Sequence, residues 1–292
     1  MSSGCDGARE LSGQTAKTSD PATAVETRSY SPSEAILYAL SVGVGSRDPA
    51  DPAELKYLHG PNLQVLPTFA TALLVSAGGA AQISRSGEDA GALLHSSESL
   101  TMHSPLPPCA TIVMRREVTG LDSQTRAATR VCHEMRVAGE DRLVATAESE
   151  VVRRSSAPAS ARRLSSHPGR PTPTFTVDLP CSRNQALLYR LLGDHNPIHV
   201  DPLAARAAGY PAPILHGLVS YGMVCRALLK ALCADVPQRL LEFSTRFTDV
   251  IFPGEALCLE TWIARPGLAT FRLRAPERDC VVQDFGRFRF SE

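Results

Sequence analysis

Residues 193–199 read Gly-Asp-His-Asn-Pro-Ile-His and place a carboxylate, Asp194, five positions before an imidazole, His199. Pro197 fixes its own φ, has no N–H and disfavours helical angles at the residue before it. The segment is therefore predicted to form a stiff, kinked loop rather than a helix face. An Asp and a His on such a loop can hold one water between them, with one group taking a proton while the other supplies one. The stretch indicates an enzyme.

The residues on both sides of this loop predict an α+β pattern. A helix is expected over 184–192, with Gly193 at its end, and a second helix over 219–232 has one apolar face. Strands are expected to follow over 242–250, 255–264, 269–275 and 281–290. The phenylalanines of the last strand do not alternate cleanly, so its boundary is the least defined.

The first half of the chain carries the same plan. A short apolar helix is expected over 35–40, and another apolar stretch opens at Pro67. Strands are expected to follow over 110–118, 126–137 and 142–152. A long central helix wrapped by an antiparallel sheet, occurring twice, would bury a sizeable core between the two halves.

Composition divides the chain into four segments. Residues 1–28 are polar and small with no aromatic side chain, which predicts a disordered tail. Residues 153–173 are rich in Pro, Ser, Ala and Arg, which predicts an extended linker. The segments that remain, 29–152 and 174–292, are the expected N-terminal and C-terminal domains.

Charge and cysteine content exclude several classes of function. Thirty basic and 30 acidic residues cancel, so nothing favours nucleic acid or an anionic membrane as partner. The eight cysteines include no Cys-x-x-Cys pair, which argues against a zinc site and against a disulfide scaffold. The N-terminus lacks a signal pattern, the longest apolar run is too short for a membrane span, and the last residues are not a Ser-Lys-Leu peroxisomal signal. A cytoplasmic protein is expected.

With its flanking residues, the loop resembles a known signature. Residues 189–202 read Tyr-Arg-Leu-Leu-Gly-Asp-His-Asn-Pro-Ile-His-Val-Asp-Pro, and residues 208–218 read Ala-Gly-Tyr-Pro-Ala-Pro-Ile-Leu-His-Gly-Leu. The two segments resemble the MaoC-like (R)-specific enoyl-CoA hydratases, also called hydratase 2, which have a hot-dog fold. Leu-Pro-Thr-Phe at 66–69 and Phe-Pro-Gly-Glu at 252–255 extend the resemblance to the two-domain form. The resemblance covers about residues 30–290 and implies a double hot-dog, with two antiparallel sheets that each wrap a central helix and pack as a pseudo-dimer.

The resemblance implies hydration of a trans-2-enoyl-CoA with a medium or long acyl chain to an (R)-3-hydroxyacyl-CoA. Asp194 and His199 match the catalytic pair, with Asp194 assigned as base and His199 as proton donor to C2; a shared or reversed assignment stays open. Gly217 matches a backbone N–H donor to the thioester carbonyl, and Asn196 is expected to hold the loop or the water. The CoA thioester is the substrate, and neither a metal nor a redox cofactor is expected.

The N-terminal half lacks the Asp/His loop and is expected to accommodate the acyl chain. A ligand-contacting His-Gly dipeptide of the family matches His95-Ser96, where serine replaces the glycine. A lysine that binds the CoA end in the family has no match near residues 121–123. Phe247 aligns with a ligand-contacting aromatic, although a plain core role on a strand is an equal interpretation.

Other interpretations stay open. The same fold could run the reverse reaction, as a 3-hydroxyacyl-thioester dehydratase acting on CoA or carrier-protein substrates, or it could bind acyl thioesters without turnover. A hot-dog thioesterase is disfavoured, because thioesterases of this fold do not usually contain the Asp/His loop. Asp201 is interpreted as a helix N-cap, His216 as a support for the loop and Tyr189 as a core residue. Dimers are common for this architecture, so a homodimer is also considered.

Overall fold

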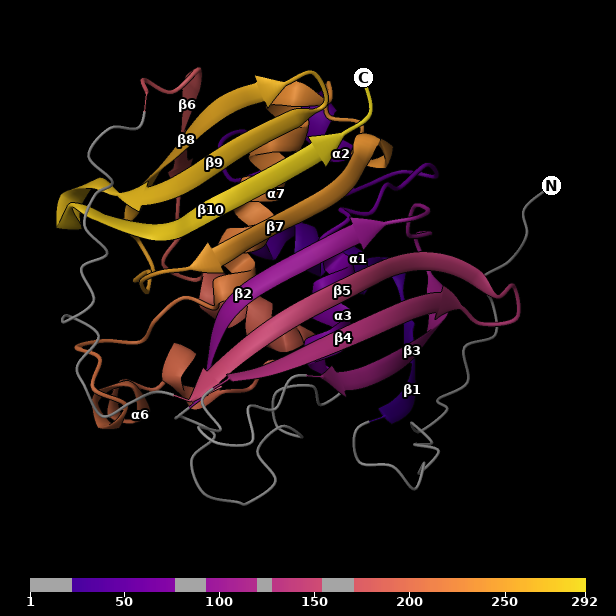
Figure 1. Cartoon of the computed structure of the whole chain (residues 1–292), viewed down its shortest axis with the longest axis horizontal. Helices are drawn as coiled ribbons and strands as arrows, with labels where there is room; N and C mark the ends of the chain where they lie inside the picture. Colours follow the sequence, from indigo (N-terminus) through magenta and orange to yellow (C-terminus); the bar gives the residue numbers. More distant parts are fainter. Residues whose placement is uncertain (1–22, 77–92, 120–127, 154–170) are drawn as a thin grey trace.

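The computed structural model describes residues 23–76, 93–119, 128–153 and 171–292. Within these residues the chain forms one ten-stranded antiparallel sheet with the order β1-β3-β4-β5-β2-β7-β10-β9-β8-β6 (Figure 1). The strands of the first half are β1 (Thr23–Tyr30), β2 (Leu93–Met102), β3 (Ala110–Thr119), β4 (Ala128–Val137) and β5 (Arg142–Arg153). The strands of the second half are β6 (Phe175–Pro180), β7 (Leu240–Phe247), β8 (Ala256–Arg265), β9 (Leu268–Ala275) and β10 (Cys280–Phe290).

The strand order shows the internal repeat directly. In each half the first strand, β1 or β6, lies at the outer edge and pairs with the third strand, β3 or β8. The second strand of each half, β2 or β7, lies at the centre, where the two strands pair with each other. We call this β2–β7 pair the seam. The predicted α+β double hot-dog is confirmed, with the two half-sheets joined edge to edge.

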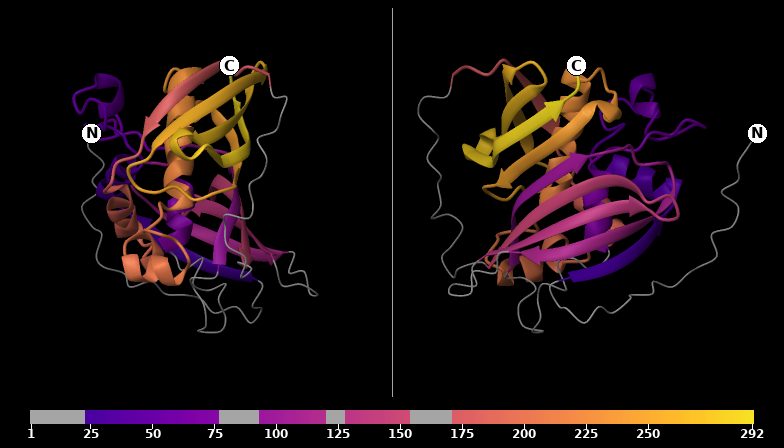
Figure 2. Two further views of the ribbon diagram at one scale, coloured as in Figure 1. Left: turned by 90° about the vertical axis from the view of Figure 1, so that its left-hand side faces the viewer. Right: turned by 45° about the vertical axis from the view of Figure 1, so that its right-hand side comes forward.

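The helices cover one face of the sheet, which curves around them (Figures 1 and 2). The α-helices are α1 (Pro32–Ser41), α2 (Pro52–Leu55), α3 (Phe69–Ser76), α5 (Gln185–Tyr189), α6 (Pro202–Ala207) and α7 (Gly217–Leu232). Single 3₁₀ turns are η3 (Arg190–Leu192), η4 (Pro197–His199), η5 (Pro237–Arg239) and η6 (Pro276–Arg278). Among the described residues, no helix combines the length and apolar character that crossing a membrane requires.

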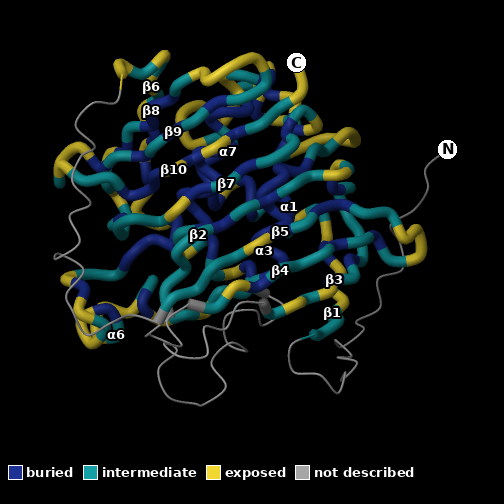
Figure 3. Tube along the Cα trace, in the orientation of Figure 1, coloured by how far each residue is buried: buried dark blue, intermediate teal, exposed yellow. Residues whose placement is uncertain are grey.

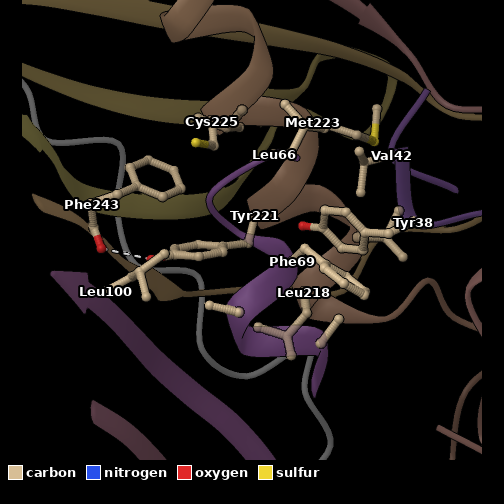
Figure 4. Close-up of a cluster of buried hydrophobic side chains, with 14 of the residues drawn as sticks. Tyr38, Val42, Leu66, Phe69, Leu100, Leu218, Tyr221, Met223, Cys225 and Phe243 are labelled. Atoms are coloured by element: carbon tan, nitrogen blue, oxygen red, sulfur yellow. Dashed lines mark hydrogen bonds between the residues drawn. The ribbon is translucent and has the colours of Figure 1, made fainter. Parts of the chain in front are cut away.

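Helix α7 is the centre of the core, and buried positions concentrate around it (Figure 3). Its Tyr221 donates a hydrogen bond to the backbone carbonyl of Phe243 on β7, at 2.6 Å (Figure 4). Tyr38 of α1 and Phe69 of α3 pack ring against ring on the other side of the helix. Side chains of both halves therefore share one core, which holds the N-terminal end of α7 in a fixed place.

Two features of the fold depart from the sequence predictions. The predicted tail extends to residue 28, whereas β1 begins at Thr23 and pairs with β3 along its whole length, so the boundary is wrong by six residues. Strands β2 and β6 are not predicted. The irregular phenylalanines of β10 reflect a register shift between Asp284 and Arg287, where Phe285 has φ +56°. Most of the predicted linker, residues 154–170, lies outside the described residues.

Candidate active site

The Asp/His loop follows α5 and η3 and is shaped by two residues with special backbone geometry. Gly193 ends η3 with φ +116°, in the region that only glycine adopts at low cost. Asn196 has ψ 119°, outside the helical range, as expected for the residue before Pro197. The kinked loop is as predicted, except that Pro197–His199 form a single 3₁₀ turn.

Side-chain oxygens hold this turn together. The Asn196 Oδ1 accepts the Ile198 backbone N–H at 3.3 Å and so caps the 3₁₀ turn. The Asp194 Oδ1 accepts the Asn196 N–H at 3.2 Å, which leaves its second oxygen available to the site. Asp201 caps α6 through Leu203 N–H at 2.7 Å, the structural role expected of it.

The structure brings the predicted pair together and adds a third residue. One ligating atom each of Asp194, His199 and His216 lies within 4.8 Å of the other two. The His199 Nδ1 lies 2.8 Å from the Ile214 carbonyl oxygen. Because a carbonyl only accepts, Nδ1 carries a proton, and the neutral ring presents an unprotonated Nε2.

Burial sets the charge of His199. Desolvation lowers the pKa of this imidazole below its usual value of 6.5, while the Asp194 charge and the Ile214 carbonyl raise it in part. The resting residue is therefore neutral at pH 7. At rest it can accept a proton through Nε2 and cannot supply one there.

His216 lies beneath the pair. Its ring stacks on that of His199, with centres 3.7 Å apart and planes 25° apart, and also contacts the Tyr189 ring, with centres 4.9 Å apart. Its Nε2 lies 3.9 Å from the Asp194 Oδ2. Burial and the nearby His199 hold the pKa of His216 well below its usual range, so this ring is also neutral. These contacts fit a support for the loop.

An Asp and two His are a donor set that divalent metals accept. The two imidazole rings stack on each other, however, with centres 3.7 Å apart. The Nδ1 of His199 is also engaged with Ile214. The arrangement suits a water held between Asp194 and His199 better than it suits an ion.

A second group of predicted residues meets at the first turn of α7. Gly217 is the first residue of this helix, and a Cβ built on it would lie 3.2 Å from the Phe247 ring. The Phe247 ring also packs on His95 of β2, with ring centres 5.2 Å apart and planes 54° apart. The structure therefore places His95, Phe247 and Gly217 in one row across the seam, next to His216.

The Ser96 side chain does not join this row and instead contacts β5. It lies at a bulge in β2, where the pairing with β5 shifts between His95 and Ser97. Its Oγ donates to the side chain of Glu150 at 2.8 Å. Glu98, three residues after His95 on the same strand, is a buried carboxylate. It is not among the functional residues predicted from the sequence.

A cavity of about 330 Å³ lies at the other end of the seam. Its lining includes Met102 and His103 after β2, Leu240 of β7 and the loop around Gln64. It contains none of the predicted site residues.

Two family models match the chain. The MFE-2 hydratase 2 N-terminal domain matches residues 29–155, and the MaoC like domain matches residues 165–270. The first match includes His95 and Ser96, and the second includes the Asp/His loop and α7.

Known proteins resemble the chain over most of its length. The enoyl-CoA hydratase ChsH3 of Mycobacterium tuberculosis is 36% identical over 87% of this chain and 90% of its own. The 3-hydroxyacyl-thioester dehydratase Y of the same organism is 35% identical over 84% of this chain and 86% of its own. The crystal structure of a MaoC-like dehydratase from Phytophthora capsici superposes with a TM-score of 0.78, at 25% identity, over 92% of this chain and 95% of that one. The chain therefore belongs to the two-domain MaoC-like hydratase 2 family.

Proposed function

We propose that this chain adds water to trans-2-enoyl-CoA thioesters of medium or long acyl chains and forms (R)-3-hydroxyacyl-CoA. The observation that carries the proposal is the convergence of Asp194 and the neutral His199 beside the first turn of α7. The family and the hydratase and dehydratase names of the relatives support the same reaction.

The protonation state of His199 suggests how the water reacts. The Nε2 of His199 takes a proton from a water that Asp194 also holds, and the water oxygen forms its bond to C3. The imidazolium then returns the proton to C2, so the substrate gains one water and the protein is unchanged. This scheme keeps His199 as the proton donor to C2, as expected from the sequence, and moves the base role from Asp194 to His199, because a neutral His199 has to accept a proton before it can donate one.

Asp194 has two tasks in this scheme. Its second oxygen orients the water. Its negative charge stabilises the imidazolium while His199 carries the proton, and for the same reason Asp194 raises the pKa of His199. The stacked His216 keeps the His199 ring in place.

The thioester oxygen gains negative charge when the bond to C3 forms. The N–H groups of the first residues of a helix have no partner within the helix and point outward. The N–H of Gly217 is thus suited to stabilise this oxygen, as a backbone donor aimed at developing charge. Water and the enoyl thioester account for every atom of the product, so we propose that no metal or redox cofactor takes part.

The second candidate is dehydration of 3-hydroxyacyl thioesters. The relative named 3-hydroxyacyl-thioester dehydratase Y favours it. The same groups serve both directions, because a catalyst accelerates forward and reverse reactions alike. A comparison of CoA and acyl-carrier-protein substrates separates the two roles. The cytoplasmic location and the homodimer stay predictions from the sequence.

Loss of enoyl-thioester absorbance, with chiral analysis of the product, tests the proposal. Short, medium and long enoyl-CoA substrates are compared for the wild type, Asp194→Asn and His199→Gln. We expect (R)-3-hydroxyacyl-CoA from the wild type and loss of turnover in both variants with the fold retained. Substantial turnover by both variants, or an (S) product, would refute the assignment.

A further inference from the structure

Glu98 is a buried acidic residue that the proposed reaction does not use. Its side chain is 1% exposed, and it lies on β2 opposite Thr245 of β7, within the seam. A carboxylate removed from water is costly unless other groups compensate it. A buried carboxylate at this position therefore indicates that Glu98 has a specific role.

Two contacts hold this carboxylate. The Glu98 Oε2 accepts a hydrogen bond from the Ser149 Oγ of β5 at 2.6 Å. The same oxygen lies 2.8 Å from the His95 Nε2, a close contact of the two side chains whose angles do not meet those of a hydrogen bond. The Oε1 has no hydrogen-bond partner among the described residues. Glu98 thus ties the His95 ring to the centre of the sheet.

From His95 the contacts continue to the helix terminus. The His95 ring packs on the Phe247 ring, which in turn fills the space beside Gly217 where a side chain would begin. The row therefore runs from the N-terminal half to the residue whose N–H faces the thioester in the proposed reaction. Each contact is a direct one between neighbouring side chains or between a ring and the glycine backbone.

We propose that Glu98 is a positioning residue for the hydration reaction, which acts through His95 and Phe247 on Gly217. The proposal rests on the proposed function. Glu98 fixes the His95 ring, the ring limits where Phe247 can lie, and Phe247 sets the first turn of α7. The N-terminal half, which lacks the Asp/His loop, thereby controls the donor to the thioester oxygen.

The expected effect falls on turnover more than on binding. A backbone donor contributes most when charge develops on the oxygen, so a small displacement weakens the transition state more than the bound substrate. Removal of Glu98 should then lower kcat and leave KM nearly unchanged. A loss of fold stability alone would change neither constant per active site.

The experiment is a set of variants assayed for kcat and KM with one medium-chain enoyl-CoA, corrected for active enzyme. Glu98→Ala should lower kcat by about tenfold, with KM within about threefold. Glu98→Gln keeps a polar group in contact with Ser149 and His95 and should restore most of the turnover. Glu242→Ala is the matched control, because Glu242 also lies on the seam but its side chain is 46% exposed. It should leave both constants unchanged.

A double-mutant cycle tests whether the effect travels through His95. In a His95→Ala background, Glu98→Ala should cause no further loss of kcat. An additive loss, an unchanged kcat in Glu98→Ala, or a loss explained by a lower fraction of active enzyme would each overturn the proposal. If Glu98→Ala does not fold, Ser149→Ala removes the other anchor of Glu98 and should lower kcat only when His95 is present. An inactive wild type would refute the proposed function itself, which is a separate outcome.

Discussion

The imidazole of His216 stacks on that of His199, with ring centres 3.7 Å apart and planes 25° apart. His216 is 2% exposed, and burial lowers its pKa against the opposing effect of a hydrogen bond with the Asp194 backbone. A histidine in such surroundings costs stability that an apolar side chain would not. We infer that His216 is present because it supports the catalytic pair: its ring stacks on His199, and its Nε2 lies 3.9 Å from the Asp194 carboxylate.

Replacement of His216 separates these two forms of support. His216→Phe keeps an aromatic surface under His199 and removes the nitrogen near Asp194, whereas His216→Ala removes both. We expect kcat/KM to fall by about tenfold in the phenylalanine variant and by about a hundredfold in the alanine variant, since a loosened base loses its alignment with the water. Steady-state kinetics of both variants check this. An equal loss in the two would show that the stack has no part in alignment.

The pH dependence of the reaction distinguishes the two assignments of the base. Burial lowers the pKa of His199 below 6.5, so a His199 that accepts the proton is active at neutral pH and becomes protonated only in acid. We expect kcat/KM to be level at neutral pH and to fall in acid, as the pH passes through the lowered pKa of His199. A His199 that donates from its resting state would give the opposite profile, with activity lost as the pH rises.

Asp194 should influence that titration in a known direction. Its charge raises the pKa of His199, so Asp194→Asn should move the titration of His199 to lower pH. The ring proton resonances of His199, followed by NMR, measure this without any need for turnover. A shift to higher pH would contradict the contact between the two groups.

The Asp/His loop could be predicted from the sequence because its determinants are local. Gly193 and Pro197 fix the backbone by their own chemistry, and the side chains of Asp194 and Asn196 bond to N–H groups two residues away. The partner of the loop, His216, is recognisable only through the motif that contains it, since its contacts with His199 cross 17 residues.

Strand β2 could not be predicted, and the reason is physical. Its residues 95–99 read His-Ser-Ser-Glu-Ser, a run without the β-branched or aromatic side chains that favour strands. The strand forms because β5 and β7 pair with it on both sides, and its Glu98 meets a partner 51 residues later in the chain. The contribution of the N-terminal half to the site therefore depends on long-range contacts that local patterns do not reveal.

Gly217 should be intolerant of a side chain because of one neighbour. A Cβ at this position would meet the Phe247 ring at 3.2 Å, closer than ordinary contact, so Gly217→Ala must displace either the ring or the helix start. We expect kcat to fall by about tenfold or more. Phe247→Leu in the same chain makes room for the methyl group and should restore part of the loss. No recovery in the double variant would place the defect elsewhere in α7.

A buried ion pair connects helices α2 and α7 across the two halves. The Arg226 Nη1 lies 2.7 Å from the Glu54 Oε1, with side chains 12% and 10% exposed, and the other Glu54 oxygen accepts the Gly45 N–H at 2.6 Å. Glu54→Ala leaves a buried guanidinium without its partner and should lower the free energy of unfolding by about 3 kcal/mol. The double variant Glu54→Leu with Arg226→Met removes both charges and should be more stable than Glu54→Ala.

Lys230→Met is the control, because the Lys230 Nζ lies 3.6 Å from the same carboxylate but its side chain is 53% exposed. This variant should lower the free energy of unfolding by less than about 1 kcal/mol. Urea unfolding with a common m-value measures all three. If Lys230→Met lowered the free energy of unfolding as much as Glu54→Ala, the buried Glu54–Arg226 pair would not be the interaction that stabilises the contact between the two halves.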